Sequence, residues 1–388
     1  MKYRGYNCKL GCPVAAALKS MRILVVTPFM WSGAGKAIVR LAGGLQSLGH
    51  SLRVVSSGRS KGFADWPVYV DQLTALKIPY AQIDFFDRAP EVLWPSIERL
   101  RHEVKDFGPD VIHAHSGVAA FGAIAGSNLP ILATLHSWNP ERPSWMNTMD
   151  LWALNRCNRV VCVSSSYRDY LLGQGLREET SITIYLGIDA NEIRTLAHLP
   201  GENRLVDKKY FCYLGRLESR KRQLLLVETL AALPEDWCLM LIGGEGEPGY
   251  ANKVRERAAE IGVSERLIST GQVENPYPLL RQSRCFVSAS ADEGLGLSAL
   301  EAMALRVPVV STPARGIVDF IQNGKTGLLA TAEPGALAEK ILYLENEPDL
   351  ASTLTSASAA LIQNTFSWPH TIDQYASLFE EIANEVRL

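Results

Sequence analysis

The sequence predicts an α/β protein with two doubly wound domains, and three observations support that fold class. The chain has 388 residues, which is too long for one ordinary hydrophobic core. Short apolar runs of the kind found in buried parallel strands alternate with helix-length segments in both halves of the chain. A composition of 47% hydrophobic and 21% charged residues is typical of a soluble globular protein.

Charge and cysteine content exclude several classes of protein. A net charge of -2 provides no general attraction to nucleic acid or an anionic membrane, so we expect no nucleic-acid partner and only local basic patches. No apolar run reaches the roughly 18 residues of a membrane span. The seven cysteines are scattered and several lie in strand-like runs, which is typical of reduced thiols in a cytoplasmic protein. Cys8 and Cys12 lack a second pair at zinc-ligand spacing.

Residues 1–20 are expected to lie outside the fold. Lys2, Arg4 and Lys9, followed by CPVAAAL, imitate a signal peptide only faintly, because the apolar part is short and lies close to Lys19. We interpret this segment as a disordered extension or as a start site assigned too far upstream, and we expect the fold to begin at Met21.

The first strand is expected in MRILVVTPF, residues 21–29, a continuous apolar run. A glycine loop is expected next at residues 32–36 (SGAGK), followed by a helix that closes on Gly49. The loop is not a P-loop, because Met30 and Ala37 stand where that motif requires Gly and Ser or Thr. Strand, glycine turn and helix form the first βα unit of a nucleotide-binding type of domain.

Five further strand-like runs are expected in the first domain, at residues 52–57, 110–115, 131–136, 159–164 and 181–187. Ligands of such sheets bind beyond the carboxyl ends of the strands, where His113, His115, His136 and Ser164 fall. A lone histidine at a strand end is usually structural. His136 opens a polar loop and is the strongest functional candidate among them.

A loop after His136 carries three tryptophans among prolines: Trp138, Trp145 and Trp152. One interpretation is an acceptor-side lip that stacks on a sugar or touches lipid. The alternative, equally weighted, is a loop whose aromatic side chains are anchored in the core.

The second domain is expected after an irregular connection at residues 191–209, and it opens with YFCYLGRLESRKRQ. Four cations follow Gly215 at the start of a helix, where the helix dipole disfavours positive charge: Arg216, Arg220, Lys221 and Arg222. An anionic ligand would resolve that conflict. The planar fork of Arg216 and the point charge of Lys221 together suit a diphosphate.

The stretch from Ala291 to Thr312, ADEGLGLSALEAMALRVPVVST, predicts a loop, a helix that starts at Leu297 or Ser298, and a buried strand. The first amides of such a helix bind anions readily, and glycines let the backbone approach a ligand. Glu293 in the loop and Glu301 in the helix can accept hydrogen bonds from hydroxyls of one ligand. The alternative is that Glu293 is solvated and Glu301 caps the helix.

This stretch resembles the E-x7-E signature of retaining glycosyltransferases of family 4, usually EGFGLxxLEAMAxGxPVV. Leu295 replaces the common Phe and Arg306 the common Gly, and neither change removes a proposed ligand contact. The turn after Gly215 resembles the family's GRLxxxKG, with Arg222 in place of Gly. Further departures are Leu186 for a usual Asn and Asp319 for a usual Glu. The resemblance covers about residues 21–388.

The resemblance implies the GT-B fold, an α/β architecture of two doubly wound Rossmann-like domains that face each other across a cleft. The implied parts are an acceptor-side domain at residues 21–195, a nucleotide-sugar-binding domain at 205–365, and a C-terminal helix at 366–388 that crosses back to the first domain.

The resemblance also implies the site residues. Glu293 would orient hydroxyls of the donor sugar, and His136 would hydrogen-bond the transferred sugar. Arg216 and Lys221 would bind the donor diphosphate, and Glu301 would hold the ribose. Further donor contacts are implied at glycine turns and at the helix start: Gly33, Gly35, Gly243, Thr270, Gly271, Gly294, Leu295, Gly296, Leu297 and Ser298. For Gly33 and Gly35 a simple tight turn is an equal alternative.

The implied activity is transfer of a sugar, with retention, from a UDP-sugar or GDP-sugar to a hydroxyl of a saccharide or lipid-linked saccharide. Bacterial lipopolysaccharide or surface-polysaccharide assembly is the implied setting, in the cytoplasm or peripherally at the inner face of the inner membrane. No Asp-x-Asp pair offers a diphosphate metal site, so we expect no metal and no cofactor. The alternatives are a sugar-nucleotide epimerase of similar fold and a non-catalytic nucleotide-sugar-binding protein.

Overall fold

The computed structural model describes residues 20–60, 63–64, 67–84, 87–199 and 209–385. The chain divides into two compact units. Unit 1 comprises Met1–Val163, Arg168–Ile184 and Thr371–Leu388, and unit 2 comprises Ser164–Tyr167 and Tyr185–His370. Each unit contains a parallel sheet of its own, which confirms the prediction of two doubly wound α/β domains. The expected extension at residues 1–20 lies outside the described residues except for Ser20.

Unit 1 is built on a seven-stranded parallel sheet in the order β5-β2-β1-β6-β7-β8-β9. Its central strands are buried on both faces, which is why they read as continuous apolar runs. The strands are β1 (Arg22–Thr27), β2 (Ser51–Ser56), β5 (Tyr80–Gln82), β6 (Val111–Ala114), β7 (Ile131–Leu135), β8 (Arg159–Cys162) and β9 (Ser181–Thr183). A short antiparallel pair, β3 (Arg59–Ser60) and β4 (Phe63–Ala64), accompanies the sheet.

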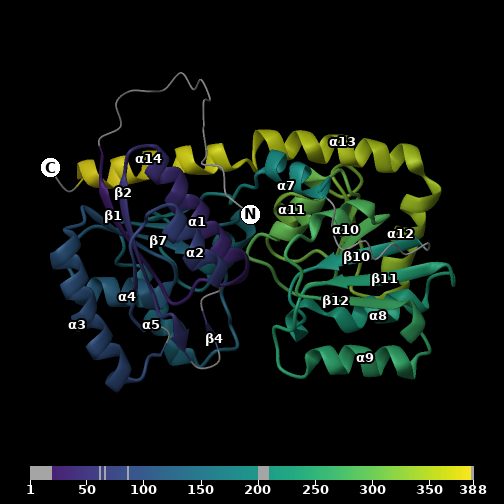
Figure 1. Cartoon of the computed structure of the whole chain (residues 1–388), viewed down its shortest axis with the longest axis horizontal. Coiled ribbons are helices and arrows are strands. Elements are labelled where there is room, and N and C mark those ends of the chain that lie inside the picture. Colours follow the sequence, from purple (N-terminus) through teal and green to yellow (C-terminus); the bar gives the residue numbers. More distant parts are fainter. Residues whose placement is uncertain (1–19, 61–62, 65–66, 85–86, 200–208, 386–388) are drawn as a thin grey trace. The chain divides into compact units, whose positions relative to one another are not determined.

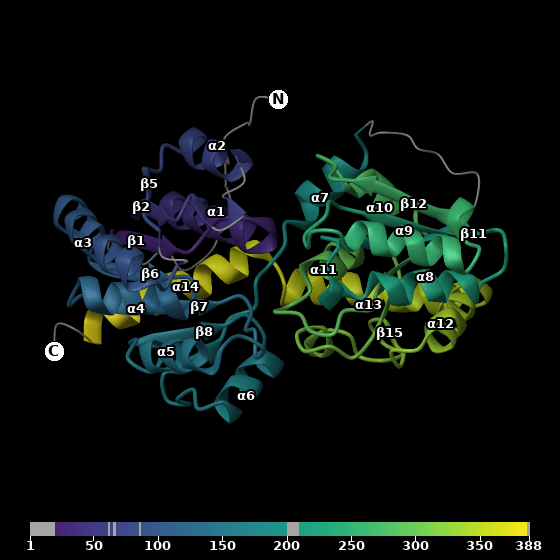
Figure 2. The same ribbon diagram turned by 90° about the horizontal axis from the view of Figure 1, so that it is seen from below.

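The helices of unit 1 cover both faces of its sheet (Figure 1). They are α1 (Ser32–Ser47), α2 (Pro67–Ala75), α3 (Pro90–Phe107), α4 (Gly117–Gly126), α5 (Ser144–Leu154), most of α6 (Ser165–Gly173) and most of α14 (Trp368–Glu385). Right-handed crossovers place α1 and α2 on one face and α3, α4 and α5 on the other, where Figure 2 shows the latter three as one layer. α14 lies with α1, since a Cβ on Gly44 would come within 2.3 Å of Ile372.

The expected glycine loop at residues 32–36 is wrong, because these residues form the first turns of α1. The Gly35 amide donates to the Trp31 carbonyl oxygen at 3.0 Å, as in a regular helix. A Cβ at Gly35 would lie 2.6 Å from the ring of Tyr69 on α2. Close helix packing therefore explains this glycine, and a turn does not.

Unit 2 has a six-stranded parallel sheet in the order β12-β11-β10-β13-β14-β15. Its strands are β10 (Lys209–Leu214), β11 (Trp237–Ile242), β12 (Leu267–Gly271), β13 (Cys285–Ser288), β14 (Val309–Ser311) and β15 (Leu328–Leu329). Its α-helices are α7 (Ala190–Ala197), α8 (Gln223–Ala231), α9 (Tyr250–Glu260), α10 (Tyr277–Gln282), α11 (Leu297–Ala304), α12 (Pro334–Asn346) and α13 (Pro348–Asn364). Three short 3-10 helices are η1 (Ser219–Lys221), η2 (Ser264–Arg266) and η3 (Ile317–Asp319).

The chain enters unit 2 earlier than the sequence indicated. Residues 185–195, expected in the first domain, group with unit 2. Ile188 pairs with Ser367, and the Arg194 guanidinium donates to the Ala304 carbonyl oxygen at 3.1 Å. At the other end, residues from Thr371 onward group with unit 1, where the Tyr375 hydroxyl lies 3.0 Å from Thr134 Oγ1.

Each sheet has one place where the chain reverses its direction of winding. In unit 1 this switch lies between β1 and β6, and in unit 2 it lies between β10 and β13. Loops that leave the carboxyl ends of the two strands diverge there, so a ligand can reach the backbone between them.

Candidate active site

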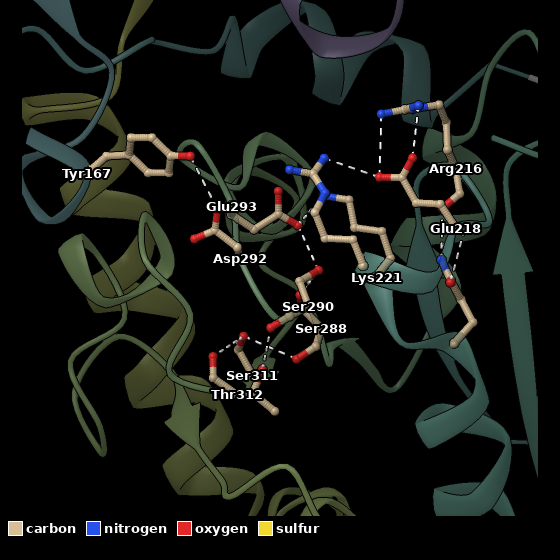
Figure 3. Close-up of polar contacts among 12 residues, drawn as sticks. Tyr167, Arg216, Glu218, Lys221, Ser288, Ser290, Asp292, Glu293, Ser311 and Thr312 are labelled. Carbon is tan, nitrogen blue, oxygen red and sulfur yellow. Dashed lines mark hydrogen bonds and ion pairs between the residues drawn. The ribbon is translucent and has the colours of Figure 1, made fainter. Parts of the chain in front are cut away.

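The loops that follow β10 and β13 bring Lys221 and Glu293 together at the switch point of unit 2 (Figure 3). Lys221 Nζ donates to Glu293 Oε1 at 2.6 Å, and the two side chains are only 11% and 14% exposed. Ser290 Oγ donates to the same oxygen at 2.7 Å. Within the described chain, both of these contacts use Oε1, which leaves Oε2 as the oxygen to accept a hydroxyl group.

Glu293 is held as a carboxylate. Burial raises the pKa of this group, but the charge of Lys221, the hydrogen bonds from Lys221 and Ser290, and the charge of Arg220 act in the opposite direction and leave its pKa below the ordinary value. An ionised carboxylate is an acceptor only. It can therefore orient hydroxyl groups of a ligand without donating a proton to them.

Arg216 forms an ion pair with Glu218, an acid that the sequence reasoning missed. Arg216 Nη1 lies 2.9 Å from Glu218 Oε2, and Arg220 Nη2 lies 3.2 Å from Glu218 Oε1. The Gln223 amide donates to the Arg216 carbonyl oxygen at 2.8 Å and fixes the turn. The signal was present as a single acid among the cations of RLESRKR.

The charge conflict expected at the start of this helix is partly resolved within the chain. Glu218 contacts two of the cations and Glu293 a third, so the two carboxylates offset part of the positive charge and an excess remains that an anionic ligand can meet. The cations also precede α8, on the loop and on η1, where the dipole penalty is smaller. Arg222 adopts a left-handed conformation with φ 53°, which accounts for the glycine usual at this position.

Asp292, the neighbour of Glu293, was also missed by the sequence reasoning. Its Oδ1 lies 2.8 Å from Arg315 Nε, and the Tyr167 hydroxyl, also in unit 2, donates to its Oδ2 at 3.3 Å. Burial raises the pKa of Asp292 above its ordinary value, although the charges of Arg315 and Arg220 and the Tyr167 hydrogen bond oppose that rise. This pair fixes the residue that precedes Glu293.

The loop that leads into α11 is tightly packed. Gly296 caps the helix with φ 91°, and a Cβ there would lie 2.5 Å from Ile317. A Cβ at Gly316 would lie 2.9 Å from the carbonyl oxygens of Glu293 and Gly294. The loop that contains Gly316 therefore packs directly against the backbone from Glu293 to Gly296 and restricts its movement.

The helix starts at Leu297, as predicted. The Ala299 amide donates to the Gly296 carbonyl oxygen at 3.0 Å, so that amide is used within the helix. The amides of Leu297 and Ser298 precede the first amide that donates within the helix, so they keep the expected role. Both residues are partly exposed, whereas Leu295 is buried.

Glu301 lies in the second turn of α11 and is 8% exposed. The Tyr277 hydroxyl, on α10, donates to its Oε1 at 3.1 Å. A helix cap, the alternative considered from the sequence, is excluded because the N-cap is Gly296 and no side-chain cap is present at this described helix.

The glycine turns of unit 2 are required by close backbone packing. A Cβ at Gly243 would lie 2.1 Å from the Gly215 carbonyl oxygen, and Gly243 has φ 143°. Gly243 also pairs with Gly271 at the end of β12, where Thr270 Oγ1 donates to the Gly271 carbonyl oxygen at 2.8 Å. The ends of β10, β11 and β12 thus approach one another closely at the edge where the cations lie.

In unit 1, His136 follows β7 and belongs to a stack of histidines. Its Nε2 lies 2.8 Å from His115 Nδ1, and the two rings are stacked with centroids 5.1 Å apart. His113 packs on His115 at 4.1 Å, and its Nε2 lies 2.8 Å from Thr134 Oγ1. Burial lowers the pKa of His113 to about 3, that of His136 to about 4, and that of His115 well below its ordinary value. All three are neutral imidazoles at neutral pH.

Gly33 and the tryptophans take different places in unit 1. Gly33 lies in the first turn of α1, so its amide remains a candidate for backbone contact. Trp138 is 4% exposed and is a core anchor. Trp145 and Trp152 are 53% and 41% exposed, so the core-anchor interpretation holds for Trp138 and not for these two.

Neither a metal cluster nor a membrane span occurs in the described part of the chain. Over those residues, no group of three or more His, Cys, Asp or Glu side chains is arranged to hold a metal ion. Among the described helices, none is both long and apolar enough to cross a bilayer.

Two family models match consecutive parts of this chain. "Glycosyltransferase Family 4" matches residues 31–192, and "Glycosyl transferases group 1" matches residues 198–361. The matched segments contain the histidine stack and the acids and cations of unit 2, respectively.

Individual relatives are distant in sequence. The chain is 26% identical over 390 residues to glycogen synthase of Mycobacterium tuberculosis (strain ATCC 25618 / H37Rv), covering 90% of this chain and 92% of the relative. It is 27% identical over 184 residues to the lipopolysaccharide core biosynthesis mannosyltransferase LpsB of Rhizobium meliloti (strain 1021), covering 45% and 52%. The crystal structure of Anabaena Alr3699/HepE in complex with UDP-glucose has a TM-score of 0.81 at 23% identity, covering 93% of this chain and 100% of that one.

Proposed function

The chain belongs to glycosyltransferase family 4, and from that membership we propose that it transfers a hexose, with retention of configuration, from a nucleoside-diphosphate sugar to a hydroxyl acceptor. The observation that carries the proposal is the 2.6 Å contact between Lys221 and Glu293 at the switch point of unit 2. It joins a cation suited to a diphosphate and an acid suited to sugar hydroxyls from two distant parts of the sequence.

In the proposed reaction, Arg216, Lys221 and the first amides of α11 stabilise the charge that develops on the departing diphosphate. Electrostatic stabilisation of this kind is commonly the largest catalytic contribution. Glu293 orients donor-sugar hydroxyls through Oε2, and Glu301 holds the ribose. Protein cations take the role that a metal ion would otherwise have, so we propose a reaction that needs no metal and no cofactor.

In unit 1, we assign His136 to a hydrogen bond with the transferred sugar. Burial lowers the pKa of His136 to about 4, so it acts as a neutral donor or acceptor and not as an imidazolium. The Gly33 amide is assigned to the donor as well. Gly35 has a packing role that accounts for it, and its amide is used within α1.

The proposed donor is a UDP-hexose, because a structure of this fold has been solved with UDP-glucose bound. The proposed acceptor is a saccharide or lipid-linked saccharide of lipopolysaccharide or surface-polysaccharide assembly, in line with the activity of the LpsB relative. With such an acceptor, the proposed location is the cytoplasm, either free or peripherally at the inner face of the inner membrane.

The test is release of nucleoside diphosphate from a panel of UDP- and GDP-sugars by the full chain and by Glu293→Ala and Lys221→Ala. Each substitution is expected to lower kcat by about 10²–10³-fold, since it removes stabilisation made mainly in the transition state. Glu265→Ala and Lys253→Ala change exposed residues of unit 2 and should leave the rate unchanged.

Unchanged release by Glu293→Ala and Lys221→Ala would show that the proposed site is wrong. An epimerised sugar recovered without acceptor would instead assign the protein to sugar-nucleotide epimerases. The anomeric configuration of the product, read by NMR, tests retention.

A further inference from the structure

One face of α5 is apolar, aromatic and exposed. Trp145, Thr148, Met149 and Trp152 recur at helical spacing on one side of the helix. With Ser144 and Phe121 of α4 they line a hollow of about 490 Å³. The rings of Phe121 and Trp152 lie 5.8 Å apart, so the hollow bridges two neighbouring helices.

The acid of α5 is buried, whereas the cation just beyond its end is exposed. The one charged residue of α5, Asp150, is turned inward, is 2% exposed, and is paired with Arg88 and Arg142 at 2.9 Å. Arg156, just beyond the helix, is exposed and lies over the ring of Trp152 at 4.0 Å. The exposed face therefore presents apolar rings with a cation at its edge, and the six residues that line the hollow include no acid.

A saccharide fits this lining less well than a lipid surface. Sugar sites combine aromatic faces with acidic or amide side chains that bind the hydroxyls, and the lining of this hollow has only the two hydroxyls of Ser144 and Thr148. Tryptophans beside a cation whose stem lies along an apolar surface are typical of proteins that rest in the headgroup region of a bilayer.

We propose that this α5 face, Trp145, Met149 and Trp152 with Arg156 at its edge, rests on the surface of an anionic lipid bilayer. The apolar rings enter the headgroup region, and Arg156 meets lipid phosphate. This inference rests on the proposed function, because a lipid-linked acceptor is the reason for the enzyme to bind a membrane. Membrane binding is assigned here to one helix of unit 1, α5.

The test is flotation of the full chain with vesicles of phosphatidylcholine alone or mixed with phosphatidylglycerol. The wild type is expected to float with the mixed vesicles and less with the neutral ones. Trp145→Gln with Trp152→Gln should lower the partition coefficient at least about tenfold. Arg156→Gln should lower binding several-fold to the anionic vesicles only, and raised salt should have the same effect.

Tyr343→Gln is the matched control. Tyr343 lies on α12 of unit 2 and is 47% exposed, close to the values for Trp145 and Trp152, and its replacement should leave flotation unchanged. Equal thermal midpoints of the variants would exclude misfolding as the cause of a loss. Nucleotide release in solution should be unchanged in the tryptophan double variant.

Three outcomes would overturn the proposal. The first is a wild-type chain that floats with neither kind of vesicle, and the second is a double variant that floats as well as the wild type. The third is tryptophan-dependent retention on an amylose or dextran gel, which would assign the face to a saccharide. Flotation needs no donor and no turnover, so its failure is distinguishable from failure of the proposed glycosyl transfer.

Discussion

The two units present their candidate groups at the same edge of the same kind of sheet, but the groups differ in charge. In unit 1 the strand ends hold a stack of neutral imidazoles, centred on His115. In unit 2 they hold cations that are matched by carboxylates, Lys221 with Glu293 and Arg216 with Glu218. Burying polar groups is costly, and unit 1 limits that cost by neutrality while unit 2 limits it by pairing.

This difference predicts different sensitivities. A neutral buried histidine must stay unprotonated in the folded state, so unit 1 should respond to pH. A paired cation that binds a diphosphate must either release its carboxylate or bind both groups. Donor binding by unit 2 should therefore change when one of its acids is replaced. The predictions below take these sensitivities in order of expected size.

The largest effect is expected from acid on unit 1. Folding lowers the histidine pKa values, so the stability they contribute is complete above the unfolded pKa of about 6.5 and falls as the pH drops below it. At about pH 5, the unfolding free energy should be lower than at neutral pH by up to about 2 kcal/mol for each buried histidine. Hydrogen exchange of β6 and β7 peptides at several pH values measures this loss.

The variant His113→Asn removes one titrating histidine, so it measures the contribution of a single proton to this pH dependence. It removes the imidazole that bonds Thr134, so it should lower stability at neutral pH and make the pH dependence shallower by about 1.4 kcal/mol per pH unit below pH 6.5. A slope equal to that of the wild type would contradict a neutral buried His113.

A smaller effect is expected from Glu218→Gln in unit 2. The change removes the carboxylate that occupies Arg216 and Arg220, so a diphosphate meets less competition and the donor KM should fall by about 3–10-fold, or about 1 kcal/mol. Glu228→Gln, in α8 and paired with Arg257, makes the same change in charge and should leave KM unaltered. A higher KM in Glu218→Gln would show instead that Glu218 orients Arg216 for the donor.

The smallest effect is expected from Arg306→Gly, which changes unit 2 without touching its paired charges. Arg306 is exposed and has φ 57°, a conformation that costs an ordinary residue about 1–2 kcal/mol. Because glycine also stabilises the unfolded chain, the net gain in unfolding free energy should be about 0.5–1 kcal/mol. Arg306→Ala retains the Cβ and should gain nothing, which urea unfolding of both variants can measure.

The sequence predicted the fold class and most strands because buried parallel strands leave continuous apolar runs. β5 escaped notice because Tyr80–Gln82 is short and lies at the sheet edge. The SGAGK segment was misjudged because a glycine that packs against Tyr69 looks the same in sequence as a glycine in a turn.

The candidate site could be predicted only in part from the sequence, because only some of its residues belong to a recognisable motif. Arg216, Lys221 and Glu293 stand in recognisable motifs, whereas Glu218 and Asp292 carry no motif and act through partners that only the folded chain brings near. The left-handed conformation of Arg222 and Arg306 explains why glycine is usual at both positions, a reason that the sequence alone did not supply.

The division of the chain has a consequence for its synthesis on the ribosome. Unit 2 ends at His370, but unit 1 also needs residues from Thr371 onward, including Tyr375 and Phe379, whose rings pack on His113. At about 5–20 residues per second, the nascent unit 1 waits on the order of ten seconds or more for its last helix. During that wait its apolar face is open to chaperones, and the unit encoded second can be the first to finish folding.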